Sequence, residues 1–578
     1  MAIENLITDH LDLWTAAVRP KSSAGRGSNS KLELTGIKKL RALILELAVR
    51  GKLVPQDPSD EPASVLLERI AAEKTRLVKE EGLRTSANEV VDIADEYIEC
   101  PSHWKWIRLG NIAKFIDYRG KTPNKIDAGV RLITAKNIRY GYIDLVPEEF
   151  ISEADYDQWM TRGFPRVGDT LFTTEAPLGN AAVIDINERF ALAQRAICFQ
   201  WHYSTVSRFM LIQILASPFQ NQLLDNSSGM TAAGVKASRL KEIPVVIPPA
   251  EEQQRIIAKV DELMALCDQL EQRSESQLAA HQTLVEALLA TLTDCADADE
   301  LAQNWARLSN HFDTLFTTEA SIDALKQTIL QLAVMGKLVP QDPSDEPASV
   351  LLARIAAEKA LLVKAGKIKK EKPLPAISED EKPSELPAGW EWCRFGYVVV
   401  LKSGCTFGKD REVEEGTIYC KVSDMNLENN AVEINTSSRF IKHSNAESTA
   451  LIPSASIIFP KRGGAIATNK KRYVRKEIFV DPNIMAATPF SLVDLKYVMT
   501  WLDSFDMAEL NSGTSVPQIN NKDIDPLLFP LPPLAEQQRI VAKVDELMAL
   551  CDQLKSRLQT SQQTQLALAE SLVEGALA

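Results

Sequence analysis

The chain carries one sequence of seventeen residues twice. GKLVPQDPSDEPASVLL begins at Gly51 and again at Gly336, 285 residues later. Around it, residues 51–79 match residues 336–364 at 26 of 29 positions. Two copies with so long a period exclude a solenoid, whose units run about 20 to 50 residues. The chain is therefore predicted to be two halves built on one frame, a pseudo-two-fold internal repeat.

Two further pairs of segments extend this frame. Residues 251–270, EEQQRIIAKVDELMALCDQL, recur at residues 535–554 with 18 of 20 identities. More weakly, PSHWKWIRLG from Pro101 aligns with PAGWEWCRFG from Pro387. Each half thus has the same order: a helix, a proline-rich connector, a Trp-containing segment, a variable block, a Pro-Pro segment and another helix.

The helix after each Pro-Pro segment has its apolar residues at steps of 4, 3, 4 and 3. This spacing is typical of a coiled-coil seam. The seam positions are Ile256, Val260, Leu263, Cys267 and Leu270 in the first copy, and Ile540, Val544, Leu547, Cys551 and Leu554 in the second. The helix that opens each half has a second apolar stripe, so each long helix has a candidate partner.

Polar residues continue the first seam at Ser274, Gln277 and His281. A histidine there can sense pH or hold a ligand, but polar seam residues more often set register, and we prefer that interpretation. Cys267 and Cys551 are interpreted as small apolar fillers of the seam and not as reactive thiols.

The variable blocks, residues 101–249 and 387–533, hardly resemble each other apart from their edges. Short runs such as GVRLITAKNI and ASIIFPKRGG alternate with Gly, Asn, Asp and Pro breaks, which favours strands and loops with a few helices. Two mixed globules of the α+β class are predicted, separated by long helices.

Net charge differs between the parts of the chain. The whole chain of 578 residues carries −13. Residues 101–248 contain 17 Lys and Arg against 14 Asp and Glu, and residues 386–533 contain 16 against 17. Most of the acidity therefore lies on the helices and connectors, and the nearly neutral blocks can present basic faces to nucleic acid.

Several classes of protein are disfavoured by what the sequence lacks. No apolar run is long enough to cross a bilayer, and no secretory leader is evident, so a cytoplasmic protein without membrane contact is expected. The eight cysteines form no CxxC pair, and the six histidines lack metal-ligand spacing. Neither disulfides nor a metal site is predicted.

Signatures of catalysis are also missing. The sequence has no GxxxxGK[ST], HExxH or GxSxG motif, and no Asn/Asp-Pro-Pro-aromatic tetrad of the kind that adenine methyltransferases use. GCTFGKD from Gly404 has one residue too few between its glycines and Asp in place of Ser or Thr. No catalytic residue is predicted, although an enzyme with an unrecognised site stays an open alternative.

A basic run in the second block points to nucleic acid. KRGGAIATNKKRYVRK, residues 461–476, holds seven basic residues and no acid, interleaved with two glycines, Asn469 and Tyr473. Cations neutralise phosphates, glycines admit backbone amides, and Asn or Arg can contact base edges. The alternative is a solvated charged hairpin. The basic residues are Lys461, Arg462, Lys470, Lys471, Arg472, Arg475 and Lys476.

The first block has candidate binding segments with fewer basic residues, DYRGKTPNK, RLITAKNIRYG and TTEAPLGN. Their place in the duplicated frame is what favours a binding role over ordinary surface. The DNA-binding candidates there are Arg119, Lys121, Lys136, Asn137, Arg139, Tyr140, Thr173 and Thr174, with Lys125, Arg131 and Asn180 nearby; Lys402, Lys421 and Ser515 complete the set in the second block.

Over nearly its whole length the chain resembles the specificity subunits of Type I restriction-modification systems. The shared marks are the two variable blocks in repeated frames, the segments PSHWKW and PAGWEW, and the endings IPPAEEQQRIIAKVDELM and LPPLAEQQRIVAKVDELM. SGTSVPQINNKDI from Ser512 resembles the segment that closes many target-recognition domains. The first block departs from it with SGMTAAGVKASRL from Ser228.

The resemblance implies that each block reads one half of a split, asymmetric double-stranded DNA site. The helices would form an antiparallel coiled coil that spaces the two domains and docks two modification subunits and the restriction subunits. This chain would bind no cofactor, since S-adenosylmethionine, ATP and Mg²⁺ would belong to the partners. A coiled-coil scaffold without DNA contact is the other alternative.

The implied organisation has five parts. They are a helical region with an N-terminal arm at 1–100, target-recognition domains at 101–249 and 386–533, a central helical region with linker at 250–385, and a C-terminal helix at 534–578.

Overall fold

A computed structural model describes residues 3–20, 32–81, 91–118, 123–193, 195–228, 233–295, 298–370, 372–442, 449–510 and 516–578. Contacts divide the chain into two compact units. Unit 1 comprises residues 1–277 and 561–578, and unit 2 comprises residues 278–560. Each unit contains one variable block and a bundle of helices.

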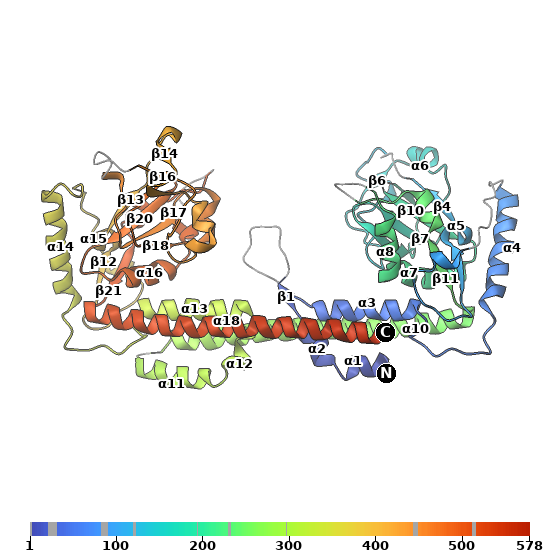
Figure 1. Ribbon diagram of the computed structural model, residues 1–578, viewed down its shortest axis with the longest axis horizontal. Coiled ribbons are helices and arrows are strands. Elements are labelled where there is room, and N and C mark those ends of the chain that lie inside the picture. The colour runs from blue at the N-terminus through green and yellow to red at the C-terminus, as the bar shows by residue number, and fades with distance from the viewer. Residues whose placement is uncertain are drawn as a thin grey trace. The chain divides into compact units, whose positions relative to one another are not determined.

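In unit 1, α3 (Thr35–Val49) lies along the first part of α10 (Ala250–Thr293) and the end of α18 (Leu534–Leu577) (Figure 1). The Arg41 guanidinium contacts the carboxylates of Asp268 and Glu271, each at 2.7 Å. Lys39 lies 3.0 Å from Glu570. The short helix therefore joins the two long helices in this unit.

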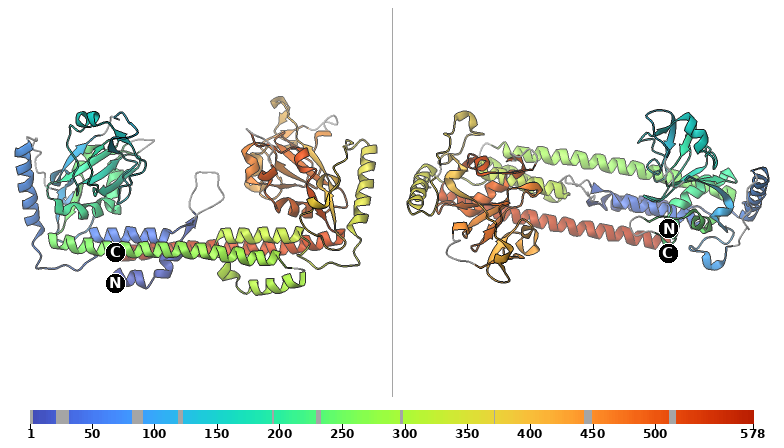
Figure 2. Two further views of the ribbon diagram at one scale, coloured as in Figure 1. Left: turned by 180° about the vertical axis from the view of Figure 1, so that it is seen from behind. Right: turned by 90° about the horizontal axis from the view of Figure 1, so that it is seen from above.

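Unit 2 repeats the arrangement with α13 (Glu319–Val334), which lies beside α18 (Figure 2). Lys326 pairs with Asp552 at 2.6 Å, and Glu319 lies 3.3 Å from Lys555, so α13 and α18 run in opposite directions. The Lys337 ammonium donates to the Thr293 carbonyl at 2.7 Å. His281 likewise contacts the Thr314 carbonyl at 3.1 Å, so α13 and α10 run the same way. Within this unit α10 and α18 are therefore antiparallel.

The apolar seam positions lie inside these bundles. Nine of the ten are buried, and Leu270 is half-buried. Ser274 is buried, Gln277 is exposed, and His281 is partly exposed. Burial raises the pKa of Cys267 and of Cys551 to about 11, so both stay thiols at neutral pH.

The two variable blocks share one topology although their sequences diverge. In each block the four-stranded antiparallel sheet has the same strand order, β4-β10-β7-β8 in the first and β13-β20-β17-β18 in the second. A second sheet contains one parallel pair, β5 with β9 and β15 with β19.

The described elements of the first block are β3 (Lys105–Arg108), α5 (Leu109–Ile112), β4 (Ala113–Asp117), β5 (Val130–Ile133), β6 (Phe150–Ile151), α6 (Glu153–Trp159), β7 (Thr170–Thr174), β8 (Leu178–Val183), β9 (Phe190–Leu192), β10 (Ala196–Trp201), α7 (Ser207–Leu215), α8 (Ser217–Asp225), α9 (Ala237–Glu242) and β11 (Pro244–Ile247).

Those of the second block are β12 (Glu391–Arg394), α15 (Phe395–Val398), β13 (Val399–Ser403), β14 (Glu412–Val413), β15 (Thr417–Cys420), β16 (Phe440–Ile441), β17 (Ser456–Pro460), the 3-10 helix η8 (Gly463–Thr468), β18 (Arg472–Val474), β19 (Phe479–Val480), β20 (Ile484–Pro489), α16 (Leu495–Asp503), α17 (Asn521–Ile524) and β21 (Leu528–Leu531).

The central strands are buried on both faces, which explains their continuous apolar runs. In the first block, Cys198, Leu171 and Ile116 are cross-strand neighbours and pack against the second sheet. Phe199 and Phe115 point to the opposite face, with their ring centroids 4.8 Å apart. Helices α7 and α8 contact β8 of this sheet. The first and last strands of each block also pair, β3 with β11 and β12 with β21.

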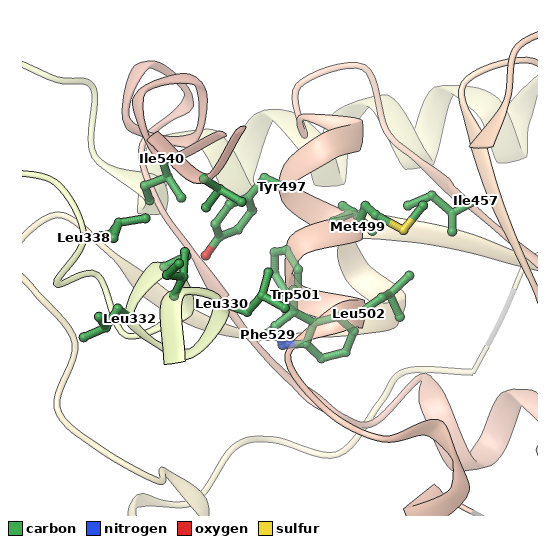
Figure 3. Close-up of a cluster of buried hydrophobic side chains, with 14 of the residues drawn as sticks. Leu330, Leu332, Leu338, Ile457, Tyr497, Met499, Trp501, Leu502, Phe529 and Ile540 are labelled. Carbon is green, nitrogen blue, oxygen red and sulfur yellow. The ribbon is translucent and has the colours of Figure 1, made fainter. Parts of the chain in front are cut away.

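The second block is attached to its helices by a buried apolar cluster (Figure 3). Tyr497 and Trp501 of α16, and Phe529 of β21, pack with Leu330 of α13 and Ile540 of α18. Trp501 stacks on Phe395 with ring centroids 4.4 Å apart, and the Tyr497 hydroxyl donates to the Pro530 carbonyl at 2.8 Å. Domain and bundle therefore share one core in unit 2.

The repeated GKLVP segment has a specific packing role. Gly51 and Gly336 follow α3 and α13 with φ of +67° and +71°, a conformation that glycine adopts without strain. A Cβ on Gly51 would lie 2.5 Å from Pro101, and one on Gly336 would lie 2.5 Å from Pro387. The GKLVP repeat and the weaker Pro-Trp repeat therefore pack against each other in each half.

One ion pair holds the frame together at the matching place in each half. Arg255 contacts Asp60 at 2.6 Å, and Arg539 contacts Asp345 at 2.6 Å. The repeated glutamates beside them are buried: Glu252 accepts from the Trp104 indole at 3.0 Å, and Glu536 accepts from Gln341 at 3.2 Å.

Stability is expected to depend on pH through Glu536. Burial raises the pKa of Glu536 above its ordinary value of 4.5. The folded chain therefore binds the proton more tightly than the unfolded chain. This difference adds to the free energy of unfolding in full below pH 4.5, and the added stability is lost as pH rises through the folded-state pKa. Glu536→Gln should unfold at a higher temperature than the wild type at pH 7, with the difference shrinking towards pH 5. Thermal scans across this range test it.

The control for this prediction is Glu546→Gln, which changes an exposed carboxylate on the same helix. We expect its unfolding temperature to follow the wild type at every pH. If the wild type instead unfolded at a higher temperature than Glu536→Gln, by a margin that grows from pH 5 to pH 7, the predicted direction of the effect would be wrong.

The structure also reveals a correspondence that the sequence comparison missed. Helices α1 (Ile3–Thr8) and α2 (Leu11–Ala16) precede α3, and α11 (Ala298–Ser309) and α12 (Phe312–Leu315) precede α13. His10 and His311 are the N-cap residues of α2 and α12, with similar backbone angles. The segments DHLD and NHFD share only His and Asp, too little to find the repeat by sequence.

The fold class is the expected one. Both units contain a mixed, sheet-containing domain, and the chain between these domains includes the long helix α10. The structure adds that the divergent blocks share the strand order of their four-stranded sheets, which their sequences did not show.

Candidate nucleic-acid interface

The basic run of the second domain forms the connection from β17 through η8 to β18. These strands pair antiparallel, with Ser456 opposite Val474 and Ile458 opposite Arg472. Gly463 has φ of +74°, and its amide donates to the Pro517 carbonyl at 2.7 Å. Segment 516–520, which follows the predicted Ser515, therefore lies against the basic turn. Ser515 itself lies outside the described residues.

Two residues of the run support the turn from inside. Asn469 adopts a left-handed conformation with φ of +50°, and its amide oxygen accepts from the Lys471 ammonium at 2.9 Å and the Met507 amide at 3.1 Å. Lys471 is buried and lies 3.2 Å from Asp503. Burial lowers the pKa of Lys471 and raises that of Asp503. Neither Asn469 nor Lys471 presents its side chain freely to solvent.

Other cations of the run also have partners. Arg472 donates to the carbonyls of Asn430 and Met425. Lys470 contacts the Asn426 amide oxygen, and Lys461 donates to the Ser403 hydroxyl at 2.8 Å. These bonds hold the side chains of the basic run in fixed positions. They leave fewer side chains available for DNA than the sequence suggested.

Two cations of the run remain exposed without an ion pair among the described residues, Arg462 and Lys476. Arg475 is also exposed, but it pairs with Glu433 at 3.0 Å and lies 5.1 Å from the Tyr473 ring centroid. Arg462 and Lys476 are therefore the strongest candidates for phosphate contact on this strand pair.

Lys402 and Lys421 lie elsewhere in the second domain. The Lys402 ammonium donates to the Leu451 carbonyl at 2.8 Å, and burial lowers its pKa. Lys421 lies 5.4 Å over the Tyr419 ring. Neither side chain is joined to the basic strand by any described contact.

In the first domain, acids neutralise most of the predicted cations. Lys125 and Lys136 lie 2.8 and 3.6 Å from Glu149, and Arg139 lies 3.3 Å from Asp144. Arg131 pairs with both Glu148 and Glu188. Arg119 and Lys121 fall outside the described residues.

Three predicted contact residues of the first domain are buried: Asn137, Thr173 and Thr174. Thr174 donates to the Arg195 carbonyl at 3.1 Å, and the Thr173 hydroxyl accepts from the Asn180 amide at 2.9 Å. We therefore revise the candidate surface to exclude these three side chains, because their polar atoms are used inside the domain. Tyr140 is 52% exposed, and its hydroxyl donates to the Leu215 carbonyl.

The described residues contain no cluster of three metal-ligating side chains, and their helices include none long and apolar enough to span a membrane. The eight cysteines all lie in the described part of the chain, and none of them forms a disulfide there.

Comparisons with known proteins agree with this arrangement. The model of the Type I restriction modification DNA specificity domain matches residues 101–280 and 387–561, which covers both variable blocks and the start of each long helix. The specificity subunit of the Type I restriction enzyme EcoAI from Escherichia coli is 42% identical over the full length of both chains. This chain belongs to the family of Type I restriction enzyme specificity subunits.

Two further specificity subunits are similar to this chain. That of EcoEI from Escherichia coli is 40% identical over the full length of both chains. Among solved structures, the HsdS subunit from Thermoanaerobacter tengcongensis covers 84% of this chain and 99% of its own, with 17% identity and a TM-score of 0.40. As a specificity subunit, the chain serves DNA recognition and not catalysis.

Proposed function

We propose that this specificity subunit reads a two-part, asymmetric DNA site in the cytoplasm, one half with each variable domain. Modification subunits, two per chain, would dock on the repeated frame and methylate the N6 atom of adenine after flipping it out of the duplex. Restriction subunits would add ATP-driven translocation and cleavage. S-adenosylmethionine, ATP and Mg²⁺ would be held by these partners.

One observation carries the proposal: two domains with the same order of strands in their four-stranded antiparallel sheets stand in nearly identical frames but have divergent sequences. A repeated frame is what two copies of one partner need. Divergent surfaces on one fold are what two different half-sites need, because base edges are read by particular side chains. Family membership also disfavours a scaffold without DNA contact.

The length of the long helices can determine the length of the DNA spacer between the two half-sites. α10 and α18 each contain 44 residues, and an α-helix of that size is about 66 Å long. We propose that the helices, and not the reading domains, determine the number of base pairs between the half-sites.

Single-molecule methylation sequencing of host DNA, with the gene intact and deleted, tests the proposal. Loss of one two-part N6-methyladenine motif on deletion is the expected result, and it identifies both half-sites and the spacer. An unchanged methylome, with the modification subunits shown to be expressed, would refute it.

The basic strand pair leads to a prediction about salt. Replacing both Arg462 and Lys476 by Ala is expected to weaken DNA binding and to flatten the plot of log affinity against log salt by about 2, since each lost phosphate contact contributes roughly 0.9. Titrations at several salt concentrations measure this slope.

A matched control replaces two exposed lysines by Ala for the same change in net charge: Lys364, the last residue of α14 (Ala348–Lys364), and Lys367, just after it. We expect its salt slope to equal that of the wild type. An unchanged slope in the Arg462 and Lys476 variant would move the phosphate contacts away from this strand pair.

A further inference from the structure

A loop of the first domain exposes an unusual amount of apolar surface. Residues 134–147 lie in the connection from β5 to β6. Within them, Tyr142 is 61% exposed and Val146 is 65% exposed, with Tyr140 and Leu145 beside them at 52% and 39%. Exposed aromatic and aliphatic side chains gathered on one short segment are typical of a contact surface.

The loop holds these side chains on a rigid base. Asn137 is 1% exposed, and its side-chain oxygen accepts from the Thr134 amide at 3.0 Å. Its side-chain nitrogen donates to the carbonyls of Asp144 at 2.9 Å and Pro147 at 3.1 Å. One buried amide therefore ties both ends of the loop together. Such preorganisation reduces the entropy lost on binding.

The loop is also fixed to the edge strand of the four-stranded sheet. The Gly141 amide donates to the Ala181 carbonyl of β8 at 2.9 Å. The Asn180 side chain, also from β8, donates to the Ile138 carbonyl at 3.0 Å. β8 ends the sheet order in the first domain, as β18 does in the second.

The second domain has an equivalent loop between β15 and β16. It is built around Asn430, which is fully buried and donates to the carbonyls of Asp424 and Thr436, each at 2.8 Å. This loop lies against β18: the Tyr473 amide donates to the Val432 carbonyl at 3.0 Å. Val432 is 65% exposed. The loop that bears apolar side chains therefore adjoins the basic run, residues 461–476.

The comparison of the domains favours DNA as the partner of the first loop. Topologically equivalent loops flank equivalent edge strands, and in the second domain that strand carries the run of cations. In the first domain the loop itself contains Lys136 and Arg139, which pair with Glu149 and Asp144 in the free chain and would exchange these partners for phosphates. Rigid apolar side chains among cations suit groove contact, where they pack on thymine methyl groups or press between base steps.

We propose that Tyr142 and Val146 make apolar contacts with bases of the half-site read by the first domain. The inference rests on the proposed function and adds to it: this domain would discriminate by shape and apolar contact, where the second relies more on charge. Tyr142 suits this role because its hydroxyl has no hydrogen-bond partner among the described residues, so the ring can be changed without breaking the loop.

The test compares Tyr142→Ala with Tyr142→Phe and with Leu361→Ala. Leu361 is 67% exposed on α14 (Ala348–Lys364), and the first repeat has Arg76 at the matching position. The full chain is assembled with its modification subunits. Affinity is then measured for duplexes that carry the methylated motif and for duplexes with single substitutions in each half-site.

Tyr142→Ala is expected to lose about tenfold in discrimination within one half-site. The other half-site and the salt slope should be unchanged, because no charge is removed. Tyr142→Phe, which keeps the ring, should retain most of the discrimination, and Leu361→Ala all of it.

Three results would overturn the inference. Unchanged discrimination in Tyr142→Ala would remove the loop from the interface with DNA. Impaired assembly with modification subunits at unchanged discrimination would show that the loop contacts protein. A wild-type chain that yields no two-part motif would refute the proposed function itself, a failure distinct from the first two.

Discussion

Deletion of one heptad from each long helix is expected to abolish methylation at the original spacing while both half-site sequences persist. The deletions are residues 271–277 of α10 and the matching residues 555–561 of α18. Seven helical residues are about 10 Å long, close to three base pairs. With one half-site out of reach, affinity for the original motif should fall by about a thousandfold, towards non-specific binding.

Selection from a DNA library with variable spacers measures this result. Both half-sites should be recovered with a changed spacer, or separately if no spacer restores both contacts. Deletion from α10 alone, residues 271–277, offsets the two long helices and should also lose the original spacing. Full affinity for the original spacing after either deletion would refute a role of the helices in setting it.

The largest effect on stability is expected from Trp501→Ala. Trp501 is 5% exposed, stacks on Phe395 and lies edge-on to Phe529 with ring centroids 5.2 Å apart. Removing a buried Trp leaves a cavity and costs about 3–5 kcal/mol in the free energy of unfolding. Hydrogen exchange by mass spectrometry should show the loss in α16 and in β12, β13 and β21, with the first domain unaffected.

Leu361→Ala serves again as the control, because it removes a comparable apolar group from an exposed position. Its exchange pattern should match that of the wild type. Exchange in α16 that is no faster in Trp501→Ala would mean that the aromatic cluster does not determine the stability of this domain.

The helical frame was predictable to a large degree. The 4, 3, 4, 3 spacing from Ile256 and from Ile540 marks surfaces that must be buried, and nine of the ten positions are. A periodic pattern of this kind is local, so sequence reveals it without knowledge of the partner. The short helices α1, α2 and α12 escaped detection because a helix of four or six residues has too few positions to show a period.

The candidate binding residues were harder to predict. Composition identified the run from Lys461 to Lys476 but could not tell Lys471, buried against Asp503, from exposed Lys476. The exposed pair Tyr140 and Tyr142 stood two residues apart in NIRYGYID, and only Tyr140 was selected. Apolar residues at every second position occur in strands, which bury them, and in loops such as this one, which expose them. The pattern alone therefore cannot tell a strand from such a loop.

By itself, the sequence determined the duplication, the long helices, the division of charge and the family. The duplication and the long helices follow from order and spacing along the chain, the division of charge from composition, and the family from motifs that the chain shares with it. The tertiary structure alone decided the strand order that the divergent blocks share, and which cations are free of ion pairs. The physical reason is that a fold requires apolar volume in the right places, which many sequences supply, whereas the availability of a charge depends on neighbours distant in sequence.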